Sequence, residues 1–138
     1  MVIAEYNVIA GFQYYNSRHF NGVLPFPRIV VRHSYRTLGV FSYETTECGN
    51  MVNSTIEISD NYDYTKEQFR DILVHEMIHY YLAYTKKDVK CTHGNEFHKM
   101  ADKFRFNYGW NITSTIDLDE YRIKKGKSKL MFKLCTFF

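Results

Sequence analysis

The feature that most constrains this chain is a group of ionisable side chains inside an apolar segment. Residues 69–84 are apolar on nearly every face of a helix, which indicates a central, buried helix. The same segment contains His75, Glu76 and His79 in the pattern HExxH. Burying these groups is costly unless they bind a metal ion or a dedicated set of partners. Two histidines four residues apart lie on one helical face, so both imidazoles can reach the same ion.

The HExxH pattern is typical of catalytic zinc sites. In such sites the glutamate accepts a proton from a water molecule that the ion activates. The alternative is structural: His75 and His79 would be hydrogen-bonded core histidines, and Glu76 would form an ion pair. The cost of burying all three groups favours the metal site, and one Zn²⁺ ion is the predicted cofactor.

A catalytic zinc site needs a third protein ligand and keeps one position open. His93 is the predicted ligand, because it stands where the next helix begins and Gly94 allows the backbone to approach closely. His98, Glu96 and Cys91 are the alternatives. His98 lies opposite an apolar helix stripe, Glu96 lies in a first helical turn where a capping role suffices, and a lone cysteine is as easily inert.

The sequence pattern predicts one α+β domain with the element order αβββαα and an extended basic C-terminal tail. A capping-box pattern at Thr65 and Gln68 marks the start of the central helix. Residues 44–53 are polar and predict a loop. The predicted helices span 2–20, 65–85 and 95–108, and the predicted strands span 28–33, 39–43 and 54–59.

Composition mainly excludes classes of protein. The 138 residues fit one domain, and 45% hydrophobic with 17% aromatic residues exclude a disordered chain. We find no apolar run long enough to cross a membrane, no signal peptide and no paired cysteines. These observations predict a cytoplasmic protein that does not bind a membrane. An association with the nucleoid is compatible with this prediction. The oligomeric state is not predicted.

The net charge of +3 is unevenly distributed. Residues 122–138 hold six basic and no acidic side chains, so residues 1–121 carry a net charge of −3. We therefore divide the chain into a domain at 1–121 and a strand-like tail at 122–138 that forms no separate domain. The tail is either a solvated edge strand or a strip that contacts nucleic-acid phosphates. In the second case the contacting residues are Arg122, Lys124, Lys125, Lys127 and Lys129.

The chain resembles the SprT-like metalloprotease domain, the catalytic module shared with the DNA–protein crosslink protease Spartan. The resemblance covers about residues 5–115. Its most specific part is HEMIH followed by HG-x-EF about fourteen residues later. The segments that carry it are Phe20–Pro25, Leu38–Glu44, Ile56–Ser59, Leu73–Tyr81 and His93–Phe97.

This resemblance implies a minimal zincin-like fold and a zinc-dependent endopeptidase. It implies that His75, His79 and His93 bind zinc and that Glu76 is the general base. It also implies that an edge strand at 54–59 binds an extended protein substrate, through Ser54, Thr55, Ile56, Glu57 and Ile58. The family's link to DNA implies substrates on or near DNA.

Two alternative functions remain at this stage. One is a zinc-stabilised, DNA-associated binding module without turnover, and the other is a peptidase that is independent of DNA. The chain lacks the paired cysteines of the zinc ribbon that follows the protease domain in several family members, which weakens the expectation of DNA dependence. The residue that stabilises the oxyanion is not predicted, although Tyr43 and Tyr108 are candidates.

Overall fold

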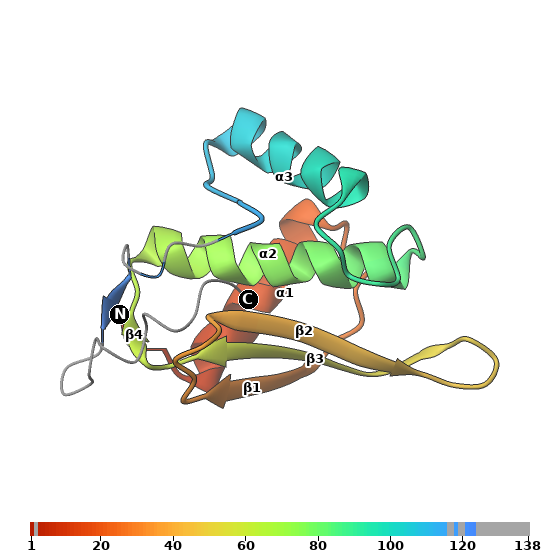
Figure 1. Ribbon diagram of the computed structural model, residues 1–138, viewed down its shortest axis with the longest axis horizontal. Helices are drawn as coiled ribbons and strands as arrows, with labels where there is room; N and C mark the ends of the chain where they lie inside the picture. Colours follow the sequence, from red (N-terminus) through yellow and green to blue (C-terminus); the bar gives the residue numbers. More distant parts are fainter. Residues whose placement is uncertain (2, 116–117, 119–120, 124–138) are drawn as a thin grey trace.

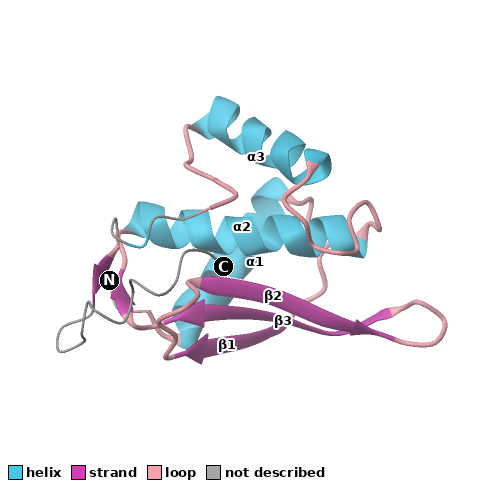
Figure 2. Ribbon diagram, viewed as in Figure 1, coloured by secondary structure: helices cyan, strands magenta, loops and turns pink. Residues whose placement is uncertain are grey.

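A computed structural model of the chain describes residues 1, 3–115, 118 and 121–123. Three helices and a three-stranded sheet form the body, and a pair of two-residue strands lies beside it (Figures 1 and 2). The helix α2 lies between the sheet and α3 in Figure 1, and α1 packs against both α2 and β1. The elements are α1 (Glu5–His19), β1 (Arg28–Arg32), β2 (Gly39–Thr45), β3 (Met51–Ser59), β4 (Tyr62–Asp63), α2 (Lys66–Tyr84), α3 (Asn95–Tyr108) and β5 (Arg122–Ile123).

The helices begin and end where local sequence signals place them. At the start of α2, the Thr65 side chain accepts a hydrogen bond from the Gln68 backbone, and Gln68 accepts one from the Thr65 backbone, both at 3.0 Å. This reciprocal cap satisfies two backbone N–H groups at the helix end. The helix α3 ends at Gly109, whose φ of 71° lies in the left-handed region that glycine adopts most readily. The fold class predicted from the sequence, α+β, is therefore correct.

The sheet has the strand order β1-β3-β2, with β1 parallel and β2 antiparallel to β3. The predicted edge strand at 54–59 is therefore wrong, because β3 lies in the centre of the sheet. Thr55 faces Arg28 of β1 on one side and Ser42 of β2 on the other, and the same two-sided pairing continues to Ile58. Among the described strands, none pairs with the outer edge of β2, the strand that packs against α2.

The hairpin between β2 and β3 is longer than the sequence indicated. Residues 44–53 are not all loop: β2 continues to Thr45, and β3 already begins at Met51. A register shift between Ser42 and Glu44 marks a bulge in β2, which lets the two strands continue pairing beyond it.

The hydrophobic core is built around α2. Five of its apolar side chains have no exposed surface, which confirms that this helix is central and buried: Ile72, Leu73, Val74, Met77 and Ile78. The Tyr80 ring stacks on Phe41 of β2 at a centroid distance of 4.9 Å, and its hydroxyl donates a hydrogen bond to the Pro25 carbonyl at 2.7 Å. This aromatic pair joins the sheet to α2.

The short strands β4 and β5 were not predicted. Tyr62 pairs with Ile123 and Asp63 with Arg122, so the first two residues assigned to the tail pair with a strand of the body. Residues 124–138 lie outside the described part of the chain. Among the described residues, no helix is both long and apolar enough to cross a membrane.

Candidate metal centre

Three histidines from two parts of the chain converge on one point. His75 and His79 lie one turn apart on α2, and His93 lies in the loop that precedes α3. Their Nε2 atoms form a triangle with sides of 3.2 Å between His75 and His79, 3.1 Å between His79 and His93, and 3.1 Å between His93 and His75. The structure therefore brings together the three histidines that sequence reasoning selected.

The orientation of the imidazoles is set by their surroundings. His75 Nδ1 lies 2.9 Å from the carbonyl oxygen of Thr113. Because a carbonyl can only accept, Nδ1 carries the proton and the lone pair of Nε2 faces the other two rings. Phe97, which is fully buried in the first turn of α3, lies under all three imidazoles at centroid distances of 4.8–4.9 Å. The Phe97 ring thus packs against all three histidine side chains.

The donor set fits a metal ion better than a hydrogen-bonded histidine cluster. Three Nε2 atoms in mutual contact cannot all be satisfied by one another, and the buried Nδ1 of His79 has no partner among the described residues. Zn–N bonds of about 2.0–2.1 Å place the ligands of a tetrahedral ion about 3.3–3.4 Å apart. The observed sides of 3.1–3.2 Å are close to that spacing.

The electrostatics keep the imidazoles neutral, as metal ligands must be. Burial, followed by the neighbouring imidazoles of His79 and His93, holds the pKa of His75 well below its usual range. Burial and His93 lower the pKa of His79 to about 4. Burial also lowers the pKa of His93, and His98 adds to this effect. The three lone pairs are thus available for a cation at neutral pH.

Glu76 lies beside this triangle and is 3% exposed. Burial raises the pKa of its carboxyl to about 8, while a hydrogen bond from the Phe41 backbone acts in the opposite direction. Its Oε2 atom has no hydrogen-bond partner among the described residues. A side chain at Gly39 would come within 3.1 Å of this oxygen, so the glycine of β2 leaves the space that the carboxyl occupies. A buried carboxyl with one free oxygen and a pKa near neutral pH is suited to proton transfer.

The structure leaves the alternative third ligands outside the cluster of ligand atoms. His98 is exposed on α3, and the carboxylate of Glu96 lies 3.6 Å from the ammonium of Lys99. Burial, together with Asp88 and Glu76, raises the pKa of the Cys91 thiol to about 11. Cys91 therefore keeps its proton in the metal-free protein, and its sulfur lies outside the cluster of ligand atoms.

The two tyrosines considered as oxyanion candidates, Tyr43 and Tyr108, make other contacts. The Tyr43 hydroxyl donates a hydrogen bond to the Val89 carbonyl at 2.6 Å. Tyr108 packs against His19 and Trp110, at centroid distances of 5.0 Å. Tyr108 also lies at the opposite end of α3 from His93, about 20 Å away for a helix of this length.

The predicted substrate residues 54–58 do not offer a free strand edge. The main chain of Thr55–Ile58 is paired on both sides, and the Ser54 hydroxyl donates to the Tyr80 hydroxyl at 3.3 Å. The structure points instead to β2, which no other described strand pairs on its outer side. An open groove of about 590 Å³ runs along this edge, lined by Phe41, Ser42, Tyr43, Glu44, Thr45, Val89, Lys90 and Cys91.

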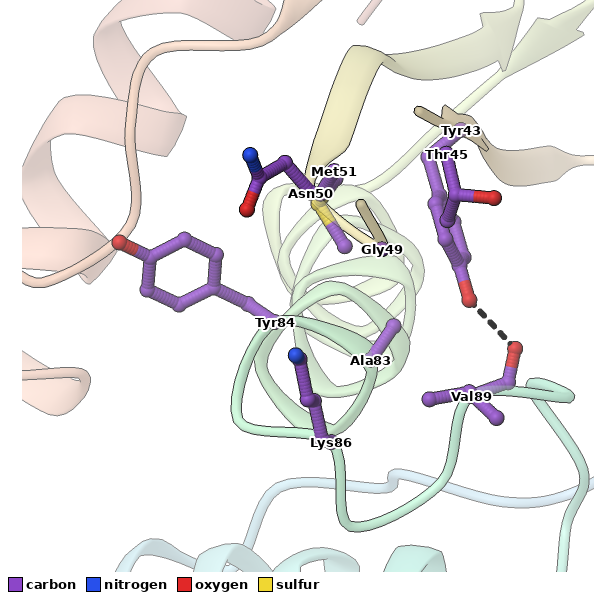
Figure 3. A pocket seen from close by; sticks show the side chains of 9 residues that line it. All are labelled: Tyr43, Thr45, Gly49, Asn50, Met51, Ala83, Tyr84, Lys86 and Val89. Carbon is purple, nitrogen blue, oxygen red and sulfur yellow. Dashed lines mark hydrogen bonds between the residues drawn. The ribbon is translucent and has the colours of Figure 1, made fainter. Parts of the chain in front are cut away.

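A second hollow lies at the C-terminal end of α2 (Figure 3). Its volume is about 840 Å³, and Ala83, one turn beyond His79, is among the residues that line it. The Tyr43–Val89 hydrogen bond spans one side of it, and the Tyr84 ring lies on the other. Sequence reasoning missed this loop–strand contact, although the alternation of Phe41, Tyr43 and Thr45 could have shown which side chains of β2 face α2.

The predicted phosphate contacts remain a prediction. Arg122 belongs to β5, and Lys124, Lys125, Lys127 and Lys129 lie outside the described residues.

A known protein family matches most of the chain. A protein-family model described as the SprT-like family matches residues 8–116 of the 138. The matched span begins within α1, ends beyond α3 and includes all three histidines and Glu76. No curated protein and no solved structure matches the chain.

Proposed function

The chain belongs to the SprT-like family, and on that premise we propose that it is a zinc-dependent endopeptidase with a minimal zincin-like fold. The observation that carries the proposal is the triangle of three Nε2 atoms at 3.1–3.2 Å, together with the buried carboxyl of Glu76, whose Oε2 atom has no hydrogen-bond partner among the described residues. Three imidazole ligands with an open fourth position suit zinc in a hydrolytic site.

A zinc ion held by His75, His79 and His93 would polarise the scissile carbonyl and acidify a water molecule. Glu76 then accepts the proton of the attacking water and delivers it to the leaving amine. Its raised pKa supports both roles, because a carboxyl that titrates near neutral pH can accept and donate a proton within one cycle. The bound cation lowers this pKa and so favours the proton-accepting form.

We propose that the substrate lies along β2 in an extended conformation. The groove beside this free edge offers main-chain groups of β2 on one side and the loop Val89–Cys91 on the other. Strand addition relies on main-chain hydrogen bonds, which every peptide can make, so the preference for substrate sequence is expected to be loose. Because Glu76 accepts from the Phe41 backbone, this edge is also next to the general base.

A zinc-stabilised binding module is the less favoured alternative. A structural zinc site is usually closed by a fourth protein ligand, and a purely structural role gives no reason to bury a carboxyl beside the ligands. Here Cys91 and Glu96 stay outside the ligand cluster, and Glu76 is buried without an ionic partner among the described residues.

The proposal is tested by measuring zinc content and proteolysis together. Purified protein should cleave an unfolded protein substrate in the presence of Zn²⁺ and lose this activity in EDTA. Glu76→Gln should bind one zinc ion as the wild type does but cleave at least 100-fold more slowly. Glu47→Gln, an exposed carboxyl in the β2–β3 loop, is the matched control and should retain full activity. Full cleavage by Glu76→Gln would refute the assignment of the base.

We further propose that the natural substrates are proteins on or near DNA, with the tail as the DNA-contacting segment. A deletion that tests this role should remove residues 124–138 and keep Arg122 and Ile123, because these two residues pair with β4. Replacing Lys124, Lys125, Lys127 and Lys129 by glutamine should reduce the salt dependence of binding to single-stranded DNA by up to about 3 logarithmic units per decade of salt. An unchanged slope would exclude the tail, and cleavage that is indifferent to DNA would favour a general peptidase.

A further inference from the structure

His93 is the ligand whose position depends most on a loop. His75 and His79 are fixed by α2, whereas His93 lies at the end of the loop 85–94 that connects α2 to α3. A metal site of defined geometry needs its ligands held before the ion binds, because ordering a loop costs free energy for each residue that is fixed. The contacts that hold this loop therefore bear on metal affinity.

The first half of the loop is attached to the body at two points. The backbone N–H groups of Lys87 and Asp88 both donate to the Leu82 carbonyl, at 2.9 and 3.1 Å, which attaches the loop to the last turn of α2. The Tyr43 hydroxyl donates to the Val89 carbonyl at 2.6 Å, which attaches it to β2 (Figure 3). Both attachments lie before residue 90 and leave the segment next to His93 to be held by other contacts.

Asp88 supplies those contacts. Its Oδ2 atom accepts one hydrogen bond from the Thr92 backbone N–H and another from the Thr92 hydroxyl, both at 2.8 Å. Thr92 immediately precedes His93. Between Asp88 and Thr92 the chain passes through Cys91, whose φ of 54° lies in the left-handed region that a cysteine rarely adopts. Two charge-assisted hydrogen bonds to one carboxylate offset the cost of this conformation.

The charge of Asp88 acts on the site as well. The carboxylate is near enough to favour the cationic forms of both His79 and His93, against the effect of their burial. A negative charge in that position also attracts a metal cation. Lys86, Lys87 and Lys90 lie on the same loop, but their side chains belong to exposed residues and are screened by water.

We propose that Asp88 is a positioning residue that holds the segment 88–93 in the conformation that presents His93 to the metal ion. The proposal rests on the proposed metal site, but not on proteolysis. The carboxylate does not bind the ion; it acts through Thr92. Its loss is expected to weaken zinc binding about 10- to 100-fold, the range typical of residues that orient metal ligands.

The test measures the zinc dissociation constant by competition with a chromophoric chelator. The variants are Asp88→Ala, Asp88→Asn and Thr92→Val, with Glu47→Gln as the control carboxyl. Asp88→Ala should bind zinc at least 10-fold more weakly than the wild type. Thr92→Val retains the backbone N–H donor, so it should lose less zinc affinity than Asp88→Ala. Asp88→Asn retains an acceptor but not the charge. The loss of zinc affinity in this variant, compared with Asp88→Ala, shows how much of the effect is geometric and how much is electrostatic.

The visible absorption of the Co²⁺-substituted protein provides a readout that a purely structural role would not change. Because His93 is displaced, the Asp88→Ala spectrum should differ from the wild type in band position and intensity at full Co²⁺ occupancy. If Asp88→Ala folds but keeps a wild-type dissociation constant and Co²⁺ spectrum, the role of Asp88 is refuted. A wild-type dissociation constant for Asp88→Asn alone supports the proposal and assigns the effect to geometry, because asparagine keeps the acceptor for Thr92. If the wild type itself binds no zinc, the metal site of the proposed function fails instead.

Discussion

Replacing Glu76 by glutamine is expected to stabilise the metal-free protein at neutral pH. The carboxyl is 3% exposed, its Oε2 atom has no hydrogen-bond partner among the described residues, and burial raises its pKa from 4.5 to about 8. Between these two values the unfolded chain is ionised while the folded protein retains the proton. The folded state therefore loses stability as the pH rises from 4.5 towards 8.

The size of this effect follows from the shift. At pH 7 the unfolded carboxyl lies 2.5 pH units above its own pKa of 4.5, which corresponds to a penalty of about 3 kcal/mol on the folded state. Glutamine has a similar shape and no charge, so it avoids this penalty. For a domain of this size, 3 kcal/mol corresponds to an increase in Tm of roughly 10 °C.

Urea unfolding in EDTA at pH 5, 6 and 7 measures the effect. The stability difference between Glu76→Gln and the wild type should be below about 1 kcal/mol at pH 5 and grow towards about 3 kcal/mol at pH 7. The histidines are common to both proteins, so their titration largely cancels in the difference. The exposed control Glu47→Gln should show no such trend. Adding zinc should reduce the difference, because a nearby cation stabilises the carboxylate.

The reasoning would be refuted by a stability difference that is the same at pH 5 and pH 7. It would also be refuted if Glu76→Gln were the less stable protein at pH 7 without metal. Either result would mean that the carboxyl is ionised and paired in the metal-free fold.

Three further predictions concern the ligands, the general base and the core. His93→Ala should lower zinc content in a metal assay, whereas the exposed His98→Ala should retain it; the reverse result would move the ligand. Gly39→Ala should reduce kcat at unchanged zinc content, because its Cβ would lie 3.1 Å from Oε2 of Glu76; an unchanged kcat would show that the carboxyl can move without loss. Tyr80→Phe should lower the free energy of unfolding by about 1–3 kcal/mol, because it leaves a carbonyl without its donor; urea titration decides this.

The parts of the fold that depend on neighbouring residues could be predicted from the sequence. The cap at Thr65, the apolar surface of α2 and the pattern HExxH all act within a few residues of one another, and the structure has each of them where the sequence placed it. The same holds for α3, which spans Asn95–Tyr108 as predicted. His93 could be selected because a helix start and a following glycine lie beside it in the sequence.

The features that the sequence did not reveal depend on contacts between distant residues. The strands β4 and β5 are separated by about sixty residues and pair over only two positions, too few for a hydrophobic pattern to show. The bond from Tyr43 to Val89 joins residues 46 apart. The contact between Asp88 and Thr92 is an exception, because these residues are only four apart. It depends on the left-handed conformation at Cys91, which a cysteine does not signal in the sequence.

The wrong assignment of the edge strand shows what strand order adds to function. Alternation of Ile56 and Ile58 predicts that one face of β3 is buried, but a central strand and an edge strand share this pattern. With β2 at the edge, one strand has two roles: its Gly39 leaves room for the Glu76 carboxyl, and its Phe41 backbone donates to it. In the proposed mechanism, a peptide that pairs with β2 is aligned by the strand that also holds the Glu76 carboxyl. On this proposal, substrate alignment and proton transfer depend on the same few residues, and a shift of β2 should reduce kcat without releasing zinc.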